Sequence, residues 1–192
     1  GVVMTYPVGI GKEGASTPVM HSKIIEKKEH PRWFPSADTR QEAEEQGIVL
    51  PRYVEAGLDN PLGDYAMRLS PPQYLIHGTN DSSGVGFRSS AGCIRMYPED
   101  IKELYSMVAL GTPVVIINER FKAGWEDHQL ELESHAPLDE KQGAQLTTSE
   151  IQELNNLLTP FIKNQHAEID WDKALAVARE ESGIQEVIGK NR

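Results

Sequence analysis

Cysteine is nearly absent from this sequence, since Cys93 is the single thiol among 192 residues. One cysteine excludes an internal disulfide framework and a zinc site built from several thiolates. Long hydrophobic runs are missing as well: no stretch approaches the roughly 18 apolar residues that span a bilayer, so we expect no membrane span. The 39% of hydrophobic and 25% of charged residues instead indicate a globular protein. The length suits one compact domain with a small appendage.

Basic residues are outnumbered, because 19 Lys and Arg stand against 29 Asp and Glu and give a formal net charge of -10. This charge repels phosphate backbones, so no nucleic-acid partner is expected. Most of the acidic excess lies in residues 126–192, which hold 14 acidic and 6 basic side chains. Five histidines lack HExxH or comparable spacing, so neither a metal nor another cofactor is expected; they are His21, His30, His128, His135 and His166.

The first 75 residues alternate short β-prone runs with glycine and proline, which predicts a mostly β domain. The expected strands are residues 2–6, 9–11, 22–27, 48–54, 65–69 and 74–76. The segment 30–47 contains two prolines and a charged, helix-tolerant stretch, so we expect it to leave the sheet and cross over it. Its aromatic residues Trp33 and Phe34 are candidates either to line a substrate groove or to cap the sheet.

Helical signals follow Cys93. Pro98 and two acidic residues predict a helix that ends near residue 109, before strands at 113–118 and 129–133. A linker at 136–147 precedes a capping box of Thr147 and Glu150, and a last helix is expected from about 171 to 182. We therefore expect a catalytic domain at 1–135 and an acidic, mostly helical extension at 136–192. The apolar stripe of the first helix in this extension is expected to pack on the β domain, with a cover over the cleft or a docking face as the alternatives; it comprises Ile151, Leu154, Leu157, Leu158, Phe161 and Ile162.

One pair of residues carries candidate chemistry: His77 after a β-prone run, and Cys93 in a polar, glycine-rich loop. A cysteine is nucleophilic as the thiolate, which a nearby imidazole or cation favours. Gly92 permits a tight turn with consecutive N–H groups for an oxyanion, and Arg95 can hold a carboxylate through its planar fork. A lone cysteine is more often a buried small hydrophobe, but the polar neighbours of Cys93 favour the catalytic interpretation.

These residues resemble the catalytic signature of the L,D-transpeptidases with a YkuD-type domain, especially those of Gram-negative bacteria. The resemblance lies in His77-Gly78-Thr79-Asn80 and in Ser90-Ala91-Gly92-Cys93-Ile94-Arg95-Met96. Further blocks at 5–11, 17–18, 59–63, 97–101 and 111–114 extend it over most of residues 1–125. The implied fold is a mostly β, YkuD-like β-sandwich with a helix after the catalytic cysteine and a helical C-terminal extension.

The resemblance also implies a reaction on peptidoglycan stem peptides in the periplasm. Cys93 would form an acyl-enzyme with a tetrapeptide stem and release D-Ala, and an amine would then accept the acyl group, either a second stem or a lipoprotein lysine. His77 would act as base and later as acid, oriented by the carbonyl of Gly78. Backbone N–H groups of Gly92 and Cys93, with that of Ala91, would form the oxyanion hole. Arg95 would bind a substrate carboxylate, with Ser90 and Asn80 as supporting hydrogen-bonding groups.

Two departures from the family pattern stand out. Ala91 occupies a position where many members have histidine, which affects the rate more than the reaction. Family domains also have strands before the run at 2–6, so we expect those strands to be missing here. The alternatives to a transpeptidase are a carboxypeptidase or endopeptidase that uses the same site, and a non-catalytic peptidoglycan-binding module.

Overall fold

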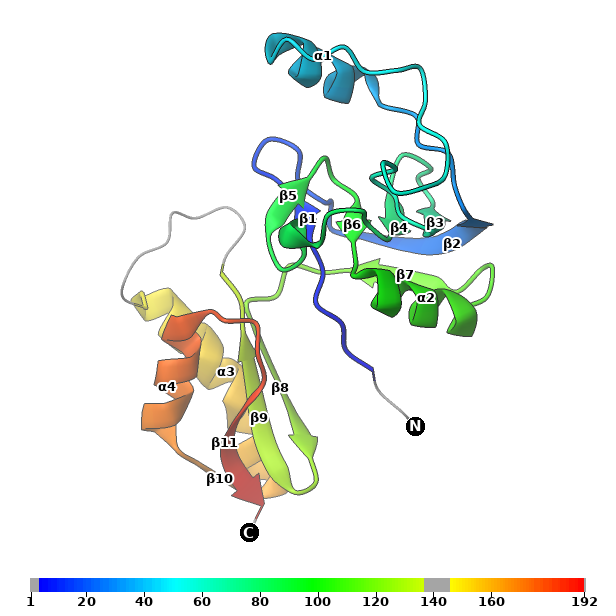
Figure 1. Cartoon of the computed structure of the whole chain (residues 1–192). Coiled ribbons are helices and arrows are strands. Elements are labelled where there is room, and N and C mark those ends of the chain that lie inside the picture. The colour runs from blue at the N-terminus through cyan, green and yellow to red at the C-terminus, as the bar shows by residue number, and fades with distance from the viewer. Residues whose placement is uncertain (1–3, 137–145, 192) are drawn as a thin grey trace. The chain divides into compact units, whose positions relative to one another are not determined.

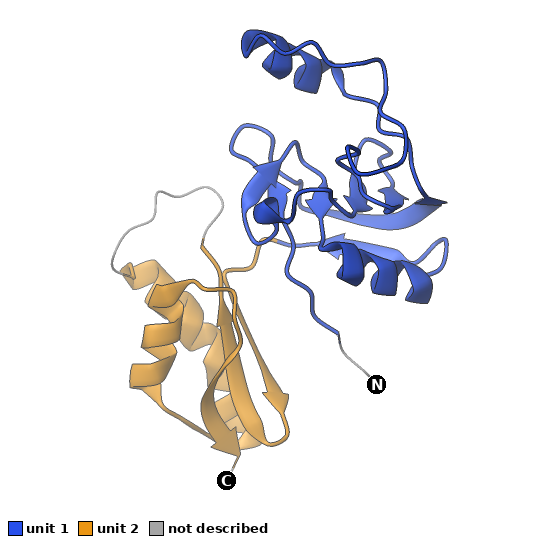
Figure 2. Cartoon of the chain, in the orientation of Figure 1, with its two compact units in different colours: residues 1–117 blue, residues 118–192 orange. Residues whose placement is uncertain are grey.

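A computed structural model describes residues 4–136 and 146–191 of the chain. The chain folds into two compact units, unit 1 at Gly1–Ile117 and unit 2 at Asn118–Arg192 (Figures 1 and 2). Each unit has its own cluster of buried apolar side chains.

Unit 1 is built on a five-stranded sheet in the order β6-β4-β3-β2-β7. The long strand β2 (Met20–Glu29) pairs antiparallel with β7 (Pro113–Ile116) through its first residues and with β3 (Tyr65–Leu69) through the rest. Strand β4 (Leu75–His77) pairs antiparallel with β3 and parallel with β6 (Ile94–Arg95). The parallel pair carries the candidate catalytic residues to the β6 edge of the sheet.

The helix α2 (Pro98–Met107) packs on this sheet. It begins with proline and two acidic residues, which suit the positive end of a helix dipole. Ile101 is 1% exposed and packs among the sheet residues Met67 and Leu69. Lys27 of β2 donates to the carbonyl oxygens of Tyr105 and Val108, at 2.6 and 2.7 Å, and so satisfies acceptors at the C-terminal end of the helix.

Short elements complete unit 1 around the loop that contains Cys93. Strand β1 (Ile10–Gly11) pairs parallel with β5 (Arg88–Ser90), and the 3-10 helix η1 (Ser82–Gly84) precedes β5. The helix α1 (Ala37–Glu45) buries none of its side chains, and Figure 1 shows it away from the five-stranded sheet. The segment expected to cross over the sheet therefore projects away from it at α1.

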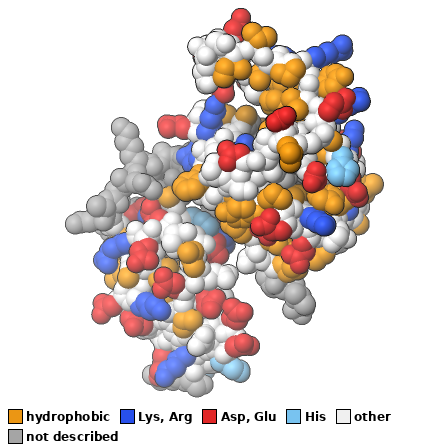
Figure 3. Space-filling view, viewed as in Figure 1, with side chains coloured by type: hydrophobic (Ala, Val, Ile, Leu, Met, Phe, Trp, Pro, Cys, Tyr) orange, Lys and Arg blue, Asp and Glu red, His pale blue; other side chains and the backbone are white. Residues whose placement is uncertain are grey.

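Unit 2 has a four-stranded sheet in the order β10-β11-β9-β8, with two helices packed against it. Its strands are β8 (Phe121–Glu126), β9 (Gln129–Ser134), β10 (Ala167–Ile169) and β11 (Glu186–Asn191). The helices are α3 (Thr148–Gln165) and α4 (Trp171–Glu180). Leu130, Leu132, Leu154 and Leu158 are at most 1% exposed in the core between them. Figure 3 shows acidic side chains spread over the visible face of this unit.

The prediction of a mostly β fold with a helix after Cys93 and helices near the C-terminus is confirmed. The capping box of Thr147 and Glu150 is confirmed as well, and Asp170 caps α4, which begins at residue 171 as expected. The boundary of the compact units, however, lies between 117 and 118 rather than between 135 and 136. The reason is pairing: β9 joins β11 as well as β8, so residues 121–134 share a sheet with the C-terminal strands. Of the expected linker, residues 137–145 lie outside the described residues.

One expected strand was wrong, and another lies only partly within the described residues. Residues 48–54 contain only an isolated bridge between Val54 and Trp33, and Pro51, which has no N–H for a ladder, interrupts the run. In the first run, residues 1–3 lie outside the described residues and residues 4–6 are not in a strand. The apolar stripe of α3 packs within unit 2, where Leu154 and Leu158 are buried while Ile151 and Ile162 are each 39% exposed.

Candidate active site

The candidate site is organised by the parallel pairing of β4 and β6. In this register Ile76 lies opposite Ile94 and His77 lies opposite Arg95. Because side chains alternate across a strand, His77 and Arg95 share the face opposite to the two isoleucines. Cys93 directly precedes β6 and lies next to Leu75, whose backbone N–H hydrogen-bonds with the thiol. Residues 16 positions apart in sequence are thereby brought to one edge of the sheet.

His77 is buried, with 4% of its surface exposed. Its Nδ1 lies 2.6 Å from the carbonyl oxygen of Gly78. A carbonyl oxygen can only accept, so this bond places the proton on Nδ1 and leaves Nε2 with a free lone pair. Burial lowers the pKa of His77 to about 4, with the charge of Arg95 acting in the same direction and the Gly78 bond opposing both. The imidazole is therefore neutral at neutral pH.

Cys93 is partly buried, and its Sγ lies 3.9 Å from the carbonyl oxygen of Gln73. Burial raises the pKa of its thiol, while the Leu75 N–H and the cations Arg68 and Arg95 lower it by less. The thiol is therefore neutral in the resting site. The sequence pattern had instead suggested a thiolate, favoured by a nearby imidazole or cation. The Arg95 charge affects the pKa values of both Cys93 and His77, so it is their common neighbour.

The turn that presents Cys93 is held by buried hydroxyl groups. Ser90, which is 4% exposed, donates through Oγ to the Cys93 carbonyl oxygen at 2.5 Å and accepts the Gly92 N–H at 3.2 Å. Thr17 Oγ1 donates to the Gly92 carbonyl oxygen at 3.0 Å. Gly92 itself has φ +103, and a Cβ there would come within 3.3 Å of the Tyr74 ring. Glycine is required because an L-side chain would be strained and would crowd that ring.

Arg95 is held through its backbone on two sides. It pairs with His77 in the sheet and exchanges two hydrogen bonds of 2.8 Å with Gly9. A Cβ on Gly9 would come 2.3 Å from the Gly84 carbonyl oxygen, so this close approach also depends on glycine. The Nε of Arg95 is buried and has no hydrogen-bond partner among the described residues. A buried guanidinium donor without a partner is suited to an anionic ligand.

The remaining expected site residues differ in their surroundings. Gly78 is buried, Gly92 and Ser90 lie in the turn before Cys93, and Ala91 and Asn80 are exposed. Two residues near Cys93, Thr17 and Arg68, were not among the expected site residues. Thr17 lies in one of the family blocks, which was the available signal, whereas the proximity of Arg68 to Cys93 arises from the pairing of β3 with β4 and has no local signal.

A small cavity of about 80 Å³ borders Leu75, the neighbour of Cys93. Phe34 lines this cavity, and its place in a substrate groove stays a prediction. Phe34 also packs against Tyr53 with ring centroids 5.7 Å apart. Trp33 instead forms a backbone bridge with Val54.

Over the described part of the chain, no helix is long and apolar enough to cross a membrane. In that same part, no three His, Cys, Asp or Glu side chains gather in a way that would hold a metal ion. The candidate site itself contains a thiol, an imidazole, guanidinium groups and backbone amides.

A cysteine, a histidine oriented by a backbone carbonyl and a glycine turn before the cysteine define a candidate site for cysteine-dependent acyl transfer. The chain belongs to the YkuD family: the model of the L,D-transpeptidase catalytic domain matches residues 1–116. This match ends one residue before the end of unit 1 at Ile117.

The chain is also similar to full-length proteins of Escherichia coli. The chain is 46% identical over 144 residues to the probable L,D-transpeptidase YcfS of Escherichia coli K12, which covers 72% of this chain and 45% of that protein. It is 38% identical over 185 residues to the probable L,D-transpeptidase ErfK/SrfK of the same organism, covering 95% of this chain and 59% of that protein. The chain thus spans about half the length of these relatives, and the second alignment includes unit 2.

Among solved structures, L,D-transpeptidase 3 from Mycobacterium tuberculosis aligns with a TM-score of 0.44 and 22% identity. The alignment covers 58% of this chain and 43% of that chain.

Proposed function

We propose that this protein is a peptidoglycan L,D-transpeptidase that uses Cys93 as its nucleophile. One observation carries the proposal: the parallel β4–β6 pair brings Cys93 and His77 to one sheet edge, with His77 Nδ1 bound to the Gly78 carbonyl oxygen at 2.6 Å. That bond leaves Nε2 as the basic nitrogen. The family membership supports a transferase, and the peptidoglycan stem as substrate follows from the family's activity.

In the proposed first step the Cys93 thiol loses its proton to His77 Nε2 as Sγ bonds to the carbonyl carbon after the third residue of a tetrapeptide stem. Because the thiol and the imidazole are both neutral at rest, the proton moves during attack and not before it. The tetrahedral oxyanion then collapses to a thioester. His77 returns the proton to the amine of D-Ala, which leaves.

In the second step an amine acceptor attacks the thioester, and His77 removes the proton that the amine loses. The bond to Sγ breaks and the thiol is regenerated. The acceptor is a second stem, which gives a 3-3 cross-link, or a lipoprotein lysine, which anchors a protein. Neither step needs a cofactor. We place both in the periplasm, where the stems are found.

The oxyanion hole is assigned to the backbone N–H groups of Cys93, Gly92 and Ala91. In the resting site the Gly92 N–H donates to Ser90 Oγ over 3.2 Å, so this donor is shared until the oxyanion forms. Arg95 is assigned to a stem carboxylate, which its unpartnered Nε supports. Ser90 positions the turn, and Asn80, being exposed, is assigned to the substrate side of the site.

The test is intact-mass spectrometry of the reduced protein mixed with a disaccharide-tetrapeptide, with and without a second stem. We expect an adduct on Cys93, release of D-Ala, and clearance of the adduct into a cross-linked dimer when the acceptor is added. Cys93→Ser and His77→Ala should abolish these products while the protein stays folded. D-Ala release without a dimer would indicate a carboxypeptidase that transfers the acyl group to water.

A non-catalytic module is the second candidate, and the raised thiol pKa of Cys93 is the observation that favours it. Such a module would bind the stem through Arg95 without forming an adduct. Saturable stem binding that Arg95→Ala removes, with no adduct and no D-Ala at any pH between 6 and 9, would replace the transpeptidase proposal.

A further inference from the structure

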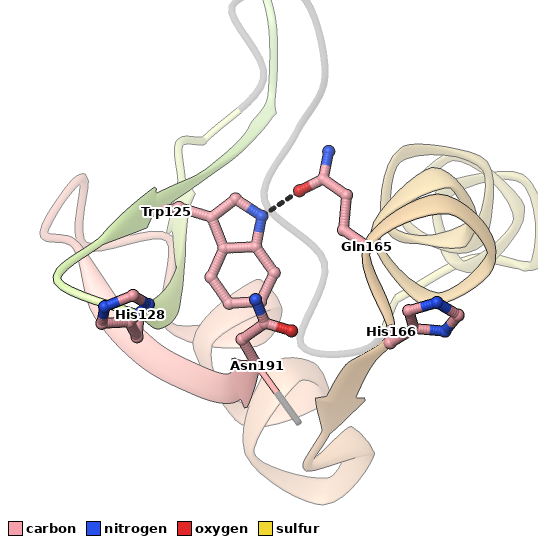
Figure 4. Close-up of a pocket in the computed structure, with 5 residues that line it drawn as sticks. All are labelled: Trp125, His128, Gln165, His166 and Asn191. Carbon is pink, nitrogen blue, oxygen red and sulfur yellow. Dashed lines mark hydrogen bonds between the residues drawn. The ribbon is translucent and has the colours of Figure 1, made fainter.

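A cavity of about 550 Å³ lies in unit 2, outside the residues that the family model matches. It is lined by Trp125 of β8, His128 of the following turn, Gln165 and His166 at the end of α3, and Asn191 of β11. Figure 4 shows the Trp125 indole in the middle of these residues, between His128 and Gln165, with the His166 ring turned away from it. The volume lies within the range of sites for small organic ligands.

Both histidines at this cavity occupy left-handed backbone positions. His128 has φ +68 in the tight turn between β8 and β9, and His166 has φ +54 at the C-cap of α3. Glycine or asparagine is the residue that such positions normally favour, because an L-side chain with a Cβ is strained there. His128 and His166 thus share a left-handed backbone, and both line this cavity.

Trp125 supplies the aromatic surface of the cavity. Its ring is half-buried, and its edge-to-face contact with Phe161, at 6.1 Å between centroids, holds the indole in place. Its Nε1 donates to Gln165 Oε1, as the dashed line in Figure 4 shows. This bond orients the carboxamide and leaves the Gln165 NH₂ group as a donor. A positioned indole beside carboxamide donors suits a ring that is apolar on its face and rich in hydrogen-bonding groups at its rim.

The charge of the cavity lining and of residues 126–192 favours a neutral ligand over an anionic one. The lining residues that the structure describes include no Asp, Glu, Lys or Arg. In the sequence, residues 126–192 carry 14 acidic and 6 basic side chains. An anionic ligand, such as a stem peptide with its carboxylates, would therefore be repelled, whereas a neutral ligand would not.

We propose that this cavity binds a neutral saccharide, with Trp125 stacked against a sugar ring and Gln165, Asn191, His128 and His166 hydrogen-bonded to its hydroxyl or acetamido groups. The expected natural ligand is an N-acetylated sugar of the peptidoglycan glycan strand, and this identity rests on the proposed function. Unit 2 would then hold the polymer whose stems react at Cys93.

The test is a titration of the full ¹⁵N-labelled chain with tetra-N-acetylchitotetraose, and separately with cellotetraose, which is neutral but lacks acetamido groups. We expect the Trp125 indole N–H signal, identified with Trp125→Phe, to shift with the N-acetylated sugar and less with cellotetraose. Equal shifts would overturn the glycan-strand assignment. No shift with either sugar, or shifts confined to unit 1, would overturn the site. Because no turnover is measured, failure here is distinguishable from failure at Cys93.

Two variants separate a binding role from a structural one. His128→Asn and His166→Asn place a residue that tolerates φ > 0 at each position, so the melting temperature should be unchanged or raised while affinity falls about fivefold, as for one lost hydrogen bond. His30→Asn is the matched control, since His30 also has a left-handed backbone, with φ +47, but lies in unit 1. Unchanged affinity in both unit 2 variants would exclude the histidines from the site.

Discussion

Ser90 Oγ donates to the carbonyl oxygen of Cys93 at 2.5 Å, so the side chain of one residue closes the turn that presents the other. The same oxygen accepts the Gly92 N–H at 3.2 Å. The Cys93 carbonyl and the Gly92 N–H therefore both bond to a single buried hydroxyl.

Replacement of this hydroxyl is expected to destabilise unit 1 and slow acylation. Ser90→Ala leaves the Cys93 carbonyl and the Gly92 N–H without their partner in a buried turn, which costs about 1–3 kcal/mol. The readouts are urea unfolding and the rate of adduct formation with a tetrapeptide stem. Ser89→Ala is the control, because Ser89 is exposed and its 2.8 Å bond to the Gly84 carbonyl oxygen lies outside the turn. Equal effects of the two variants would remove the positioning role of Ser90.

The rate of Cys93 alkylation should continue to rise with pH beyond the pKa of an ordinary thiol. Burial raises the pKa of Cys93 more than the Leu75 N–H, Arg68 and Arg95 lower it, so little thiolate is present at pH 7. The measurement is the rate of reaction with iodoacetamide between pH 5 and 10. A plateau of rapid reaction at pH 5–7 would instead reveal a thiolate–imidazolium pair at rest.

Acid is expected to destabilise unit 1 through His77. The pKa of His77 is about 4 in the folded protein and 6.5 in the unfolded chain, so the unfolded state binds more protons between these values. This contribution to stability is complete above pH 6.5 and decreases as the pH falls towards 4, by about 2–3 kcal/mol between pH 7 and 4.5.

The measurement for His77 is urea unfolding followed through Trp33 in a Trp125→Phe, Trp171→Phe background, in which the remaining tryptophan belongs to unit 1. His77→Gln should reduce the loss of stability between pH 7 and 4.5 by this amount. Carboxylate titrations contribute equally to both proteins, so the difference between them reports the imidazole. The same pH dependence with and without the imidazole would contradict a buried, neutral His77.

Arg95→Lys tests whether the guanidinium fork binds a carboxylate. Lysine keeps the charge but lacks the planar fork, so we expect KM for the tetrapeptide stem to rise about tenfold or more, with a smaller change in kcat. The pH profile of Cys93 alkylation should stay unchanged, since the cation is retained. Arg179→Lys in the last turn of α4 is the control for a generic surface change. A fall in kcat at constant KM would argue against carboxylate binding.

Leu158→Ala should destabilise unit 2 by about 2–5 kcal/mol, because it opens a cavity at a position that is 0% exposed. Ile162→Ala, one turn later on α3 and 39% exposed, should have a much smaller effect. Unfolding is followed through Trp125 and Trp171 in a Trp33→Phe background, in which both remaining tryptophans lie in unit 2. Equal losses from the two variants would mean that the core does not centre on Leu158.

Local patterns predicted the helices and several strands. Pro98 with two acidic residues predicted the start of α2, and the capping box of Thr147 and Glu150 predicted the start of α3. These signals are readable because a cap satisfies its own helix end through residues three positions apart. The run at 48–54 has the β-prone composition of a strand, but it forms only the bridge between Val54 and Trp33. Composition alone does not tell whether a run pairs with another strand.

For this protein the sequence alone determined the candidate chemistry, since the order and spacing of His77, Gly92, Cys93 and Arg95 already indicated the family. Tertiary structure decided those features that depend on pairing between strands far apart in the chain. The β9–β11 pair assigned residues 121–134 to unit 2, and the β3–β4 pair brought Arg68 towards Cys93. Burial then raised the pKa of Cys93 and lowered the pKa of His77. Pairing and desolvation depend on residues far apart in the chain, and no local pattern records them.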